Sequence, residues 1–376
     1  MKIGILTYHR ARNYGAYMQA YALTAFLNAR GYDSEIIDFD MKKAQKRYLK
    51  EMLVQKSIGK IRTNIALERT FKKARKNLTL SQESLVSDNM QEFVNFVKNR
   101  YDCIVVGSDE VWRIESFRGM DTPYWLNSKM DCIKVSYAAS SRSDMQSITE
   151  EEKNFLKNAL DEFRLVSVRD AYTYQQVSGL CDKNKIFLCC DPTFLYDFKS
   201  SAQNGKKILK ERCGIDETKP TILIMSNRSE VVNGIREKYT GKANLVGLFY
   251  YQKGIKNIGN IAPMEWADVI SAGDLLITTY FHGMCFAIKG NTNFIAVEAR
   301  KEIDKAGKMY DLLERENLLS KFIRKKDSGF ESRLLELIEE NLNKNEDFTN
   351  VVMNERELSA QYWEQFDKLL EQTNEV

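Results

Sequence analysis

The alternation of short apolar runs with amphipathic segments is the feature that most constrains this chain. Residues 3–7 form an apolar run, and residues 35–39 (Glu-Ile-Ile-Asp-Phe) form another. Between them, the apolar residues of 16–27 recur with the helical period, after the N-cap type residue Asn13 and before Gly31. Strand, helix and strand joined by short connections predict a βαβ unit and a largely parallel sheet.

The alternation continues along the chain, which indicates an α/β fold. Its 376 residues exceed one typical core, and the polar, basic stretch 197–210 is the best linker candidate. We therefore expect one α/β domain at 1–200 and a second at 201–345. The C-terminal helical segment 346–376 should contain a long helix at 354–373. Further strands are expected at 102–107, 134–139, 165–168, 186–189, 221–225, 244–251, 275–278 and 294–297.

The Lys- and Arg-rich stretch 41–77 predicts one or two exposed helices, within an insertion of about residues 41–100. Its charge is either a solvated basic face or a functional basic patch. The formal net charge of the whole chain, +4, indicates neither nucleic acid nor a membrane as a partner, and it suits an anionic substrate.

The chain shows no signal-peptide pattern and no apolar run of membrane-spanning length, so we expect a soluble, cytoplasmic protein. Its seven cysteines form no C-x-x-C pair, and several lie in apolar runs, as expected of buried reduced thiols. With two histidines in the chain, no metal site is predicted.

Four segments follow predicted strands, where open parallel sheets bind their ligands. The first, after residues 3–7, contains His9, Arg12, Asn13, Tyr14 and Gly15. Its helix N-terminus favours an anion, but it lacks G-x-G-x-x-G, so a dinucleotide site is not supported. The alternative is that Asn13 only caps the helix and Gly15 only permits close packing.

The second segment, Gly107-Ser108-Asp109, is either part of a site or a turn with an N-cap. The third contains Arg169, a cation that is costly to bury unless an anion meets it. That anion is either a substrate or a protein partner, Asp170 or another acid.

The fourth segment, Thr279-Tyr280-Phe281-His282-Gly283, joins a strand to a helix. An imidazole there can give and take protons near neutrality, although His282 could instead only cap the helix. We expect the loops around Asn13-Tyr14-Gly15 and around His282 to line one cleft.

Taken together, these segments resemble the polysaccharide pyruvyl transferase family from residue 3 to about 320. The landmarks, in the order of the family, are Ile3-Gly4-Ile5-Leu6-Thr7, Asn13-Tyr14-Gly15-Ala16, Gln19-Ala20-Tyr21-Ala22-Leu23, Val106-Gly107-Ser108-Asp109-Glu110-Val111-Trp112, Ser136-Tyr137-Ala138-Ala139-Ser140, Ser167-Val168-Arg169-Asp170, Asp191-Pro192-Thr193 and Phe281-His282-Gly283.

The resemblance implies a glycosyltransferase-B-like fold, with two Rossmann-like domains facing across a cleft. It implies transfer of pyruvate from phosphoenolpyruvate to a sugar as a ketal, with release of phosphate and no other cofactor. The acceptors are capsular, exopolysaccharide or cell-wall saccharides, often lipid-linked, which would bring the protein to the inner face of the membrane. Nucleic acid is not expected as a partner, and a homo-oligomer is compatible with this family.

The resemblance also implies roles for single residues. Arg169 matches a position that holds phosphoenolpyruvate, and His282 matches the acid or base. A lysine after the histidine should contact the donor: Lys308 is our choice, with Lys301 and Lys305 as rivals. The C-terminal domain would bind phosphoenolpyruvate, and the N-terminal domain the acceptor.

One position departs from the family: Tyr280 stands where many members have an arginine. A lost charge-assisted hydrogen bond is worth about 1.5–3 kcal/mol. Either Arg10, Arg12 or Arg300 compensates, or the donor preference has changed, or activity is lost. The alternatives to a pyruvyl transferase are a glycosyltransferase that uses a nucleotide sugar and a non-catalytic saccharide-binding protein.

Overall fold

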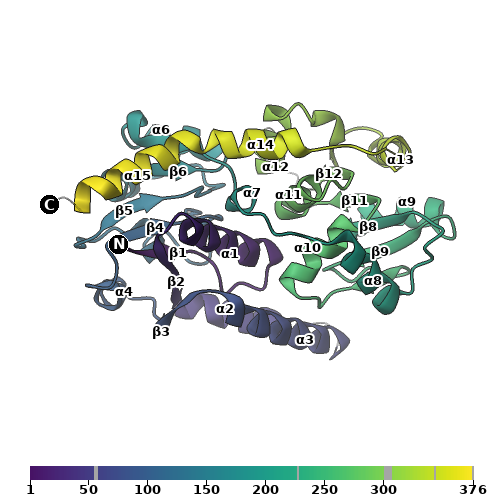
Figure 1. Cartoon of the computed structure of the whole chain (residues 1–376), viewed down its shortest axis with the longest axis horizontal. Helices are drawn as coiled ribbons and strands as arrows, with labels where there is room; N and C mark the ends of the chain where they lie inside the picture. The colour runs from purple at the N-terminus through teal and green to yellow at the C-terminus, as the bar shows by residue number, and fades with distance from the viewer. Residues whose placement is uncertain (55–57, 227, 300–306, 343, 375–376) are drawn as a thin grey trace. The chain divides into compact units, whose positions relative to one another are not determined.

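The computed structural model of the chain describes residues 1–54, 58–226, 228–299, 307–342 and 344–374 (Figure 1). It divides into two compact units. Unit 1 comprises Met1–Ile61, Arg75–Tyr196 and Asn354–Val376, and unit 2 comprises Arg62–Ala74 and Asp197–Met353. The helices α3 (Ile58–Ala74) and α14 (Thr349–Leu358) each contain a point where the chain passes from one unit to the other.

Unit 1 is built on a parallel sheet in the order β3-β2-β1-β4-β5. Its strands are β1 (Lys2–Leu6), β2 (Asp33–Asp40), β3 (Leu80–Val86), β4 (Cys103–Val106) and β5 (Ile133–Ser136). The parallel pair β6 (Val166–Val168) and β7 (Ile186–Leu188) adjoins β5 through two isolated bridges. The helices of this unit are α1 (Tyr14–Ala29), α2 (Lys42–Leu53), α4 (Met90–Val97), α5 (Glu150–Asp161), α6 (Ala171–Ser178), α7 (Pro192–Leu195) and α15 (Ala360–Asn374).

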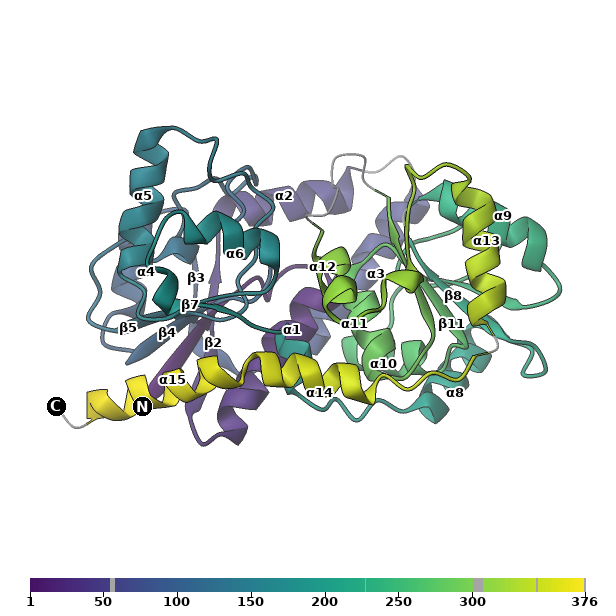
Figure 2. The ribbon, with the colours of Figure 1, turned by 90° about the horizontal axis from the view of Figure 1, so that it is seen from above.

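Unit 2 repeats the Rossmann-like order in a second parallel sheet, β10-β9-β8-β11-β12-β13. Its strands are β8 (Thr221–Met225), β9 (Asn244–Leu248), β10 (Lys256–Ile258), β11 (Leu275–Thr278), β12 (Phe294–Glu298) and β13 (Phe322–Arg324). Its helices are α8 (Ala202–Cys213), α9 (Ser229–Tyr239), α10 (Pro263–Ser271), α11 (Phe281–Lys289), α12 (Lys308–Arg315) and α13 (Phe330–Asn341). In Figure 2, α9 and α13 lie side by side. Their apolar side chains pack against alternate residues of the strands, and together these residues form one hydrophobic core.

The expected α/β fold with parallel sheets is confirmed, and its local signals act as predicted. Every residue of β4, β8, β11 and β12 is buried, as expected of strands covered on both faces. The Asn13 side chain accepts a hydrogen bond from the Ala16 N–H at 3.2 Å and so caps α1. All seven cysteines are free thiols, five of them buried and two half-buried.

Three predictions about local structure are wrong. The predicted linker 197–210 begins where the chain passes from unit 1 to unit 2, but most of it is the start of α8, which Ser201 caps and Gly214 ends. The expected helix at 354–373 is two helices, because Ser359 interrupts it and hydrogen-bonds to Tyr137 and to the Cys190 N–H. The helical insertion is also shorter than residues 41–100, since β3 is an edge strand of the sheet.

The C-terminal helix belongs to unit 1 (Figure 2). The Tyr362 hydroxyl donates to the Ser136 carbonyl at 2.8 Å, and the Trp363 ring packs 4.6 Å from that of Tyr137. The end of the chain therefore completes a core that the first strands of the sequence begin.

Gly107 ends β4 in a conformation that only glycine fits, because its φ is +122° and a Cβ there would lie 2.2 Å from the Tyr137 carbonyl oxygen. We expect Gly107→Ala to reduce the free energy of unfolding by on the order of 3 kcal/mol. Gly31→Ala is the control, since φ is +89° with open space around it, and it should cost about 1–2 kcal/mol. Urea unfolding of both variants measures the difference. Equal losses would contradict the steric argument.

Candidate functional site

The loops that follow β1 and β4 meet at the carboxyl edge of the unit 1 sheet. The Gln19 amide joins them, because it donates to the Thr7 hydroxyl at 2.8 Å and accepts from the Ser108 N–H at 3.1 Å. Thr7 in turn donates to the Ser108 carbonyl at 3.1 Å. Two predicted segments, the one with Asn13 and the one with Gly107, are thus held together by buried side chains.

Arg169 is buried at the same edge, next to Asp191. Its Nη1 lies 2.5 Å from the Asp191 carboxylate and 3.4 Å from the Ser108 hydroxyl, and both charged side chains are at most 1% exposed. Asp170 has another role, as it caps α6 and accepts from the Ser140 hydroxyl. The structure therefore favours the alternative of a structural ion pair, with Asp191 as the partner. A role for Arg169 in donor binding stays a prediction.

His9 is also part of the protein interior. Its Nε2 lies 2.7 Å from the Asp38 carboxylate, its Nδ1 lies 3.2 Å from the Thr7 carbonyl, and its side chain is fully buried. Burial alone would raise the pKa of Asp38, but hydrogen bonds from His9 and Arg10 outweigh it and lower the pKa to about 2. This geometry favours a structural role for His9.

The remaining predicted residues of unit 1 differ in exposure. Tyr14 and Gly15 are buried in the first turn of α1, whereas Asn13 is exposed and Arg12 donates to the Tyr48 carbonyl at 3.1 Å. Asp109 is half-buried, with a φ of +81°. The first segment therefore offers Arg12 and Asn13 to a ligand more readily than its neighbours.

His282 is the second residue of α11, at the carboxyl edge of the unit 2 sheet. Its ring packs edge to face against Phe281, with centroids 5.3 Å apart, and the Lys308 ammonium lies 5.3 Å from the centroid of the same Phe281 ring. Tyr280 is the N-cap residue, so His282 does not cap this helix. A cation, an imidazole and a helix N-terminus thus surround one phenyl ring. Lys301 and Lys305, the rivals of Lys308, lie outside the described residues.

Tyr280 stacks on Tyr250, a residue that follows β9, with ring centroids 5.2 Å apart and planes 19° from parallel. Burial raises the pKa of Tyr280, while a hydrogen bond with Tyr250 and the charge of Arg228 oppose the rise. Arg228 follows β8 and is exposed, and it is the positive charge that acts on the Tyr280 phenol.

Hydrogen bonds to Thr278 and Met225 fix the shape of the loop that contains Thr279 and Tyr280. The Thr278 hydroxyl accepts from the Tyr280 N–H at 3.0 Å, and the Thr279 N–H donates to the Met225 carbonyl at 3.0 Å. A Cβ on Gly283 would lie 2.6 Å from the Thr278 hydroxyl oxygen, so a side chain at residue 283 would displace this turn.

Two of the three cations suggested as substitutes for a family arginine belong to unit 1 and not to the unit of Tyr280. Arg10 is held by both oxygens of Asp38 in unit 1, and Arg12 also belongs to unit 1. Arg300 lies outside the described residues. Arg228 was missed by sequence reasoning, although its place after a strand could have indicated it.

The family model for polysaccharide pyruvyl transferases matches residues 13–299. The chain belongs to the polysaccharide pyruvyl transferase family. The match includes every predicted site residue except His9, Arg12 and Lys308, and it makes a transferase the coarse assignment. No curated protein matches the chain significantly.

Solved structures similar to this chain share its fold. Sucrose-phosphate synthase from Thermosynechococcus elongatus is 11% identical, with a TM-score of 0.56, over 98% of this chain and 99% of that one. UDP-GlcNAc 2-epimerase from Methanocaldococcus jannaschii, in complex with UDP-GlcNAc and UDP, is 14% identical, with a TM-score of 0.54, over 96% and 100%. At this level of identity the likeness concerns the fold alone, and it confirms the glycosyltransferase-B-like architecture of two Rossmann-like domains.

Arg169 and His282, which the resemblance assigned to one substrate, belong to different units. Among the described residues, no group of three or more His, Cys, Asp or Glu side chains is arranged to hold a metal ion. Nor does this part of the chain contain a helix with the length and apolar character needed to cross a membrane.

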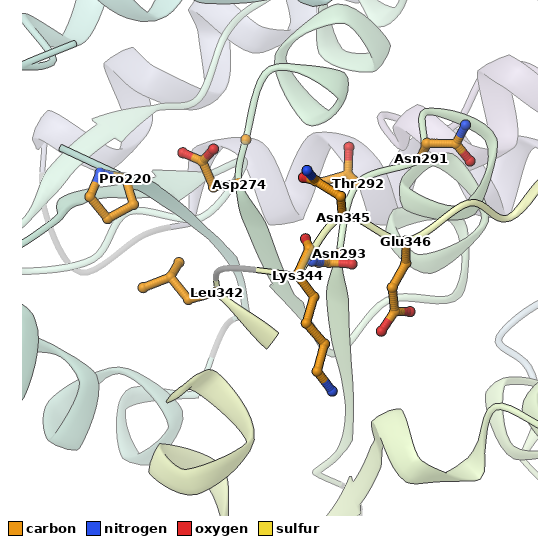
Figure 3. Close-up of a pocket in the computed structure, with 10 residues that line it drawn as sticks. Pro220, Asp274, Asn291, Thr292, Asn293, Leu342, Lys344, Asn345 and Glu346 are labelled. Carbon is orange, nitrogen blue, oxygen red and sulfur yellow. Dashed lines mark hydrogen bonds between the residues drawn. The ribbon is translucent and has the colours of Figure 1, made fainter. Parts of the chain in front are cut away.

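A cavity of about 400 Å³ in unit 2 lies at the opposite edge of its sheet (Figure 3). Its lining includes Pro220, Asp274 and Asn293, which directly precede β8, β11 and β12. Asp274 accepts from the Thr221 N–H at 2.7 Å, and Asn293 donates to the Asn341 carbonyl at 2.8 Å. These polar groups join elements of the fold, at the edge away from His282.

Removing Asp191 would leave the Arg169 charge buried beside Ser108. We expect Asp191→Ala to reduce the free energy of unfolding by about 3–5 kcal/mol, and the double variant Arg169→Met with Asp191→Leu to recover much of the loss. Glu83→Ala is the control, because Glu83 pairs with Arg100 at the surface and should change stability by less than about 1 kcal/mol. Urea denaturation compares the variants. A loss at Asp191 no larger than that at Glu83 would refute a structural role for the pair.

Proposed function

We propose that this protein transfers pyruvate from phosphoenolpyruvate to a saccharide, forming a ketal and releasing phosphate. The observation that supports it best is that, in a chain of this family, His282 and Lys308 both lie against the Phe281 ring at the carboxyl edge of the unit 2 sheet. The acceptor is a capsular, exopolysaccharide or cell-wall saccharide, free or lipid-linked. Phosphoenolpyruvate is the donor substrate, and no further cofactor takes part.

The chemistry needs an acid or base beside the reacting carbon. Carbon 3 of phosphoenolpyruvate must gain a proton as carbon 2 becomes electrophilic, and the attacking sugar hydroxyls must lose theirs. His282 is the titratable side chain that unit 2 offers at the start of α11, and imidazole exchanges protons near neutrality. His282 is therefore the proposed proton donor and acceptor.

The donor carries a carboxylate and a phosphate, which need cations and N–H donors. Lys308 lies over the Phe281 ring, and the first turn of α11 directs its N–H groups toward the same edge. Arg228 adds a second positive charge next to Tyr280. We infer that Arg228 and Lys308 bind the donor, and that Arg228 replaces the charge that Tyr280 lacks.

Arg169 is better suited to positioning than to direct contact. Its guanidinium ties the loop that follows β7, through Asp191, to Ser108 after β4. In this role, Arg169 keeps the carboxyl edge of unit 1 in shape for the acceptor.

We expect His282→Gln to lower the release of phosphate from phosphoenolpyruvate by at least about 100-fold. The assay uses a panel of lipid-linked and nitrophenyl sugars as acceptors. The variant removes proton exchange and retains a polar side chain of similar size. Release that persists unchanged in His282→Gln would defeat the assignment.

Thermal stabilisation by a nucleoside diphosphate but not by phosphoenolpyruvate would indicate a glycosyltransferase instead. Sugar binding without any phosphate release would indicate a non-catalytic protein.

Donor affinity tests the two cations. Lys308→Gln and Arg228→Gln should each raise the KM for phosphoenolpyruvate by about 10- to 100-fold, the equivalent of one charge-assisted hydrogen bond. The controls are Lys289→Gln, which removes an ammonium 5.8 Å from the Phe198 ring, and Arg236→Gln, which removes a guanidinium that donates to the Lys253 carbonyl. Steady-state kinetics at fixed acceptor gives the KM values. Equal values for the variants and their controls would remove both residues from the donor site.

A further inference from the structure

Unit 1 contains a cavity of about 310 Å³ that neither its fold nor the donor chemistry uses. It lies among the loops that follow the carboxyl ends of β1 and β4, next to α2. The side chains that matter in its lining are Tyr8, Arg47, Glu110, Arg113, Phe117 and Arg118. Its volume is at the lower end of the range for small-molecule pockets, so one sugar residue suits it better than a longer chain.

Arg118 is the central side chain of this cavity. It is only 6% exposed, and its guanidinium lies 3.9 Å from the centroid of Tyr8 and 4.5 Å from that of Phe117. One Nη donates to the Tyr48 hydroxyl at 2.7 Å, whereas Nε is buried and has no hydrogen-bond partner among the described residues. A buried donor without a partner is costly, so a ligand oxygen that accepts from Arg118 would be favoured.

The two carboxylates of the lining already have partners within unit 1. Glu110 accepts from Arg142 at 2.8 and 3.0 Å, and Glu115 accepts from the Ser143 hydroxyl. The guanidinium of Arg47 lies 5.9 Å from the Phe117 ring, and Arg113 is half-buried in the lining. Arg47 pairs with Glu51 and Glu110 pairs with Arg142, so these charges largely cancel. Arg113 and Arg118 then outnumber Glu115 in the lining, so the site favours a negative charge.

The aromatic rings specify the rest of the ligand. A pyranose has an apolar face of C–H groups and a rim of hydroxyls. Tyr8 and Phe117 offer flat apolar surface, and the carboxylate oxygens of Glu110 and Glu115 can accept from hydroxyls. Aromatic rings next to arginine side chains suit a sugar that carries an acidic group.

We propose that this cavity is the subsite for the acceptor, and that it takes a sugar residue with a carboxylate or a phosphate. Arg118 and Arg113 bind the acidic group, while Tyr8 and Phe117 pack on the ring. This assignment rests on the proposed pyruvyl transfer, for which it names the acceptor class and a site in unit 1.

Ligand-observed NMR with the full chain at pH 7 tests the proposal by direct binding. The probes are methyl glucuronide, glucose 1-phosphate and the neutral methyl glucoside. At least one anionic probe should bind about 10-fold tighter than the glucoside, and the stronger of the two identifies the carboxylate or the phosphate as the preferred group. Arg113→Gln should abolish that preference, and Phe117→Ala should weaken all three probes about 5-fold or more.

These two variants are chosen because Phe117 is exposed and Arg113 half-buried, so both should fold, unlike a change at the buried Arg118. The matched control is Arg100→Gln, which removes a guanidinium 4.8 Å from the Phe96 ring elsewhere in unit 1. It should bind all probes like the unchanged chain.

Equal binding of anionic and neutral probes, no binding of any probe, or variants that behave like Arg100→Gln would overturn the proposal. The test is separate from that of the reaction. If sugar discrimination holds but phosphate release from phosphoenolpyruvate is absent, the pyruvyl transfer fails and the subsite stands. If release occurs but Arg113→Gln and Phe117→Ala leave the acceptor KM unchanged, only the subsite fails.

Discussion

Parallel pairing of a central strand with neighbours on both sides is the constraint on which each unit depends. β1 lies between β2 and β4, and β8 lies between β9 and β11. The interior strands of such a sheet are covered on both faces. The residues of the interior strands β4, β8 and β11 are accordingly all buried, and they are apolar or small. Because the strands run in one direction, every βα loop emerges at the same edge. The polar side chains of the βα loops therefore collect at that edge.

At this edge, several charged side chains of unit 1 pair with one another. Arg169 with Asp191 is a fully buried pair, and the buried His9 pairs with the half-buried Asp38. Arg169, Asp191 and His9 follow β6, β7 and β1, and Asp38 lies within β2. A buried charge without a partner is costly, and the protein supplies the partner in both pairs. These residues fix the loops, and the groups around the Arg118 cavity are those that we propose for a ligand.

Unit 2 shows how a departure from a family pattern can be accommodated. Tyr280 stacks on Tyr250, so the phenol has an aromatic partner, and Arg228, after a neighbouring strand, is the cation that we propose in place of the family arginine. Neighbouring parallel strands end at the same edge, so a cation can move from one loop to the next and still face a similar volume. In the proposed donor site, the positive charge therefore comes from another loop at the same edge.

The sequence by itself determined the class of fold, the Asn13 cap, the places where loops could carry chemistry and ten of the thirteen strands that the structure describes. The strands β3, β10 and β13 were not among those expected. The features that the sequence determined follow from the periodicity of apolar residues along the chain and from hydrogen bonds between residues close together in it. It did not reveal that Asp191 partners Arg169, that Ser359 interrupts the last helix by bonding to Tyr137, or that Arg118 lies between Tyr8 and Phe117. Each of these contacts joins residues far apart in the chain or depends on a loop path that local propensity leaves open. Only the tertiary structure decided which charges the fold satisfies and which remain for a substrate, because that depends on the distances between side chains brought together by packing.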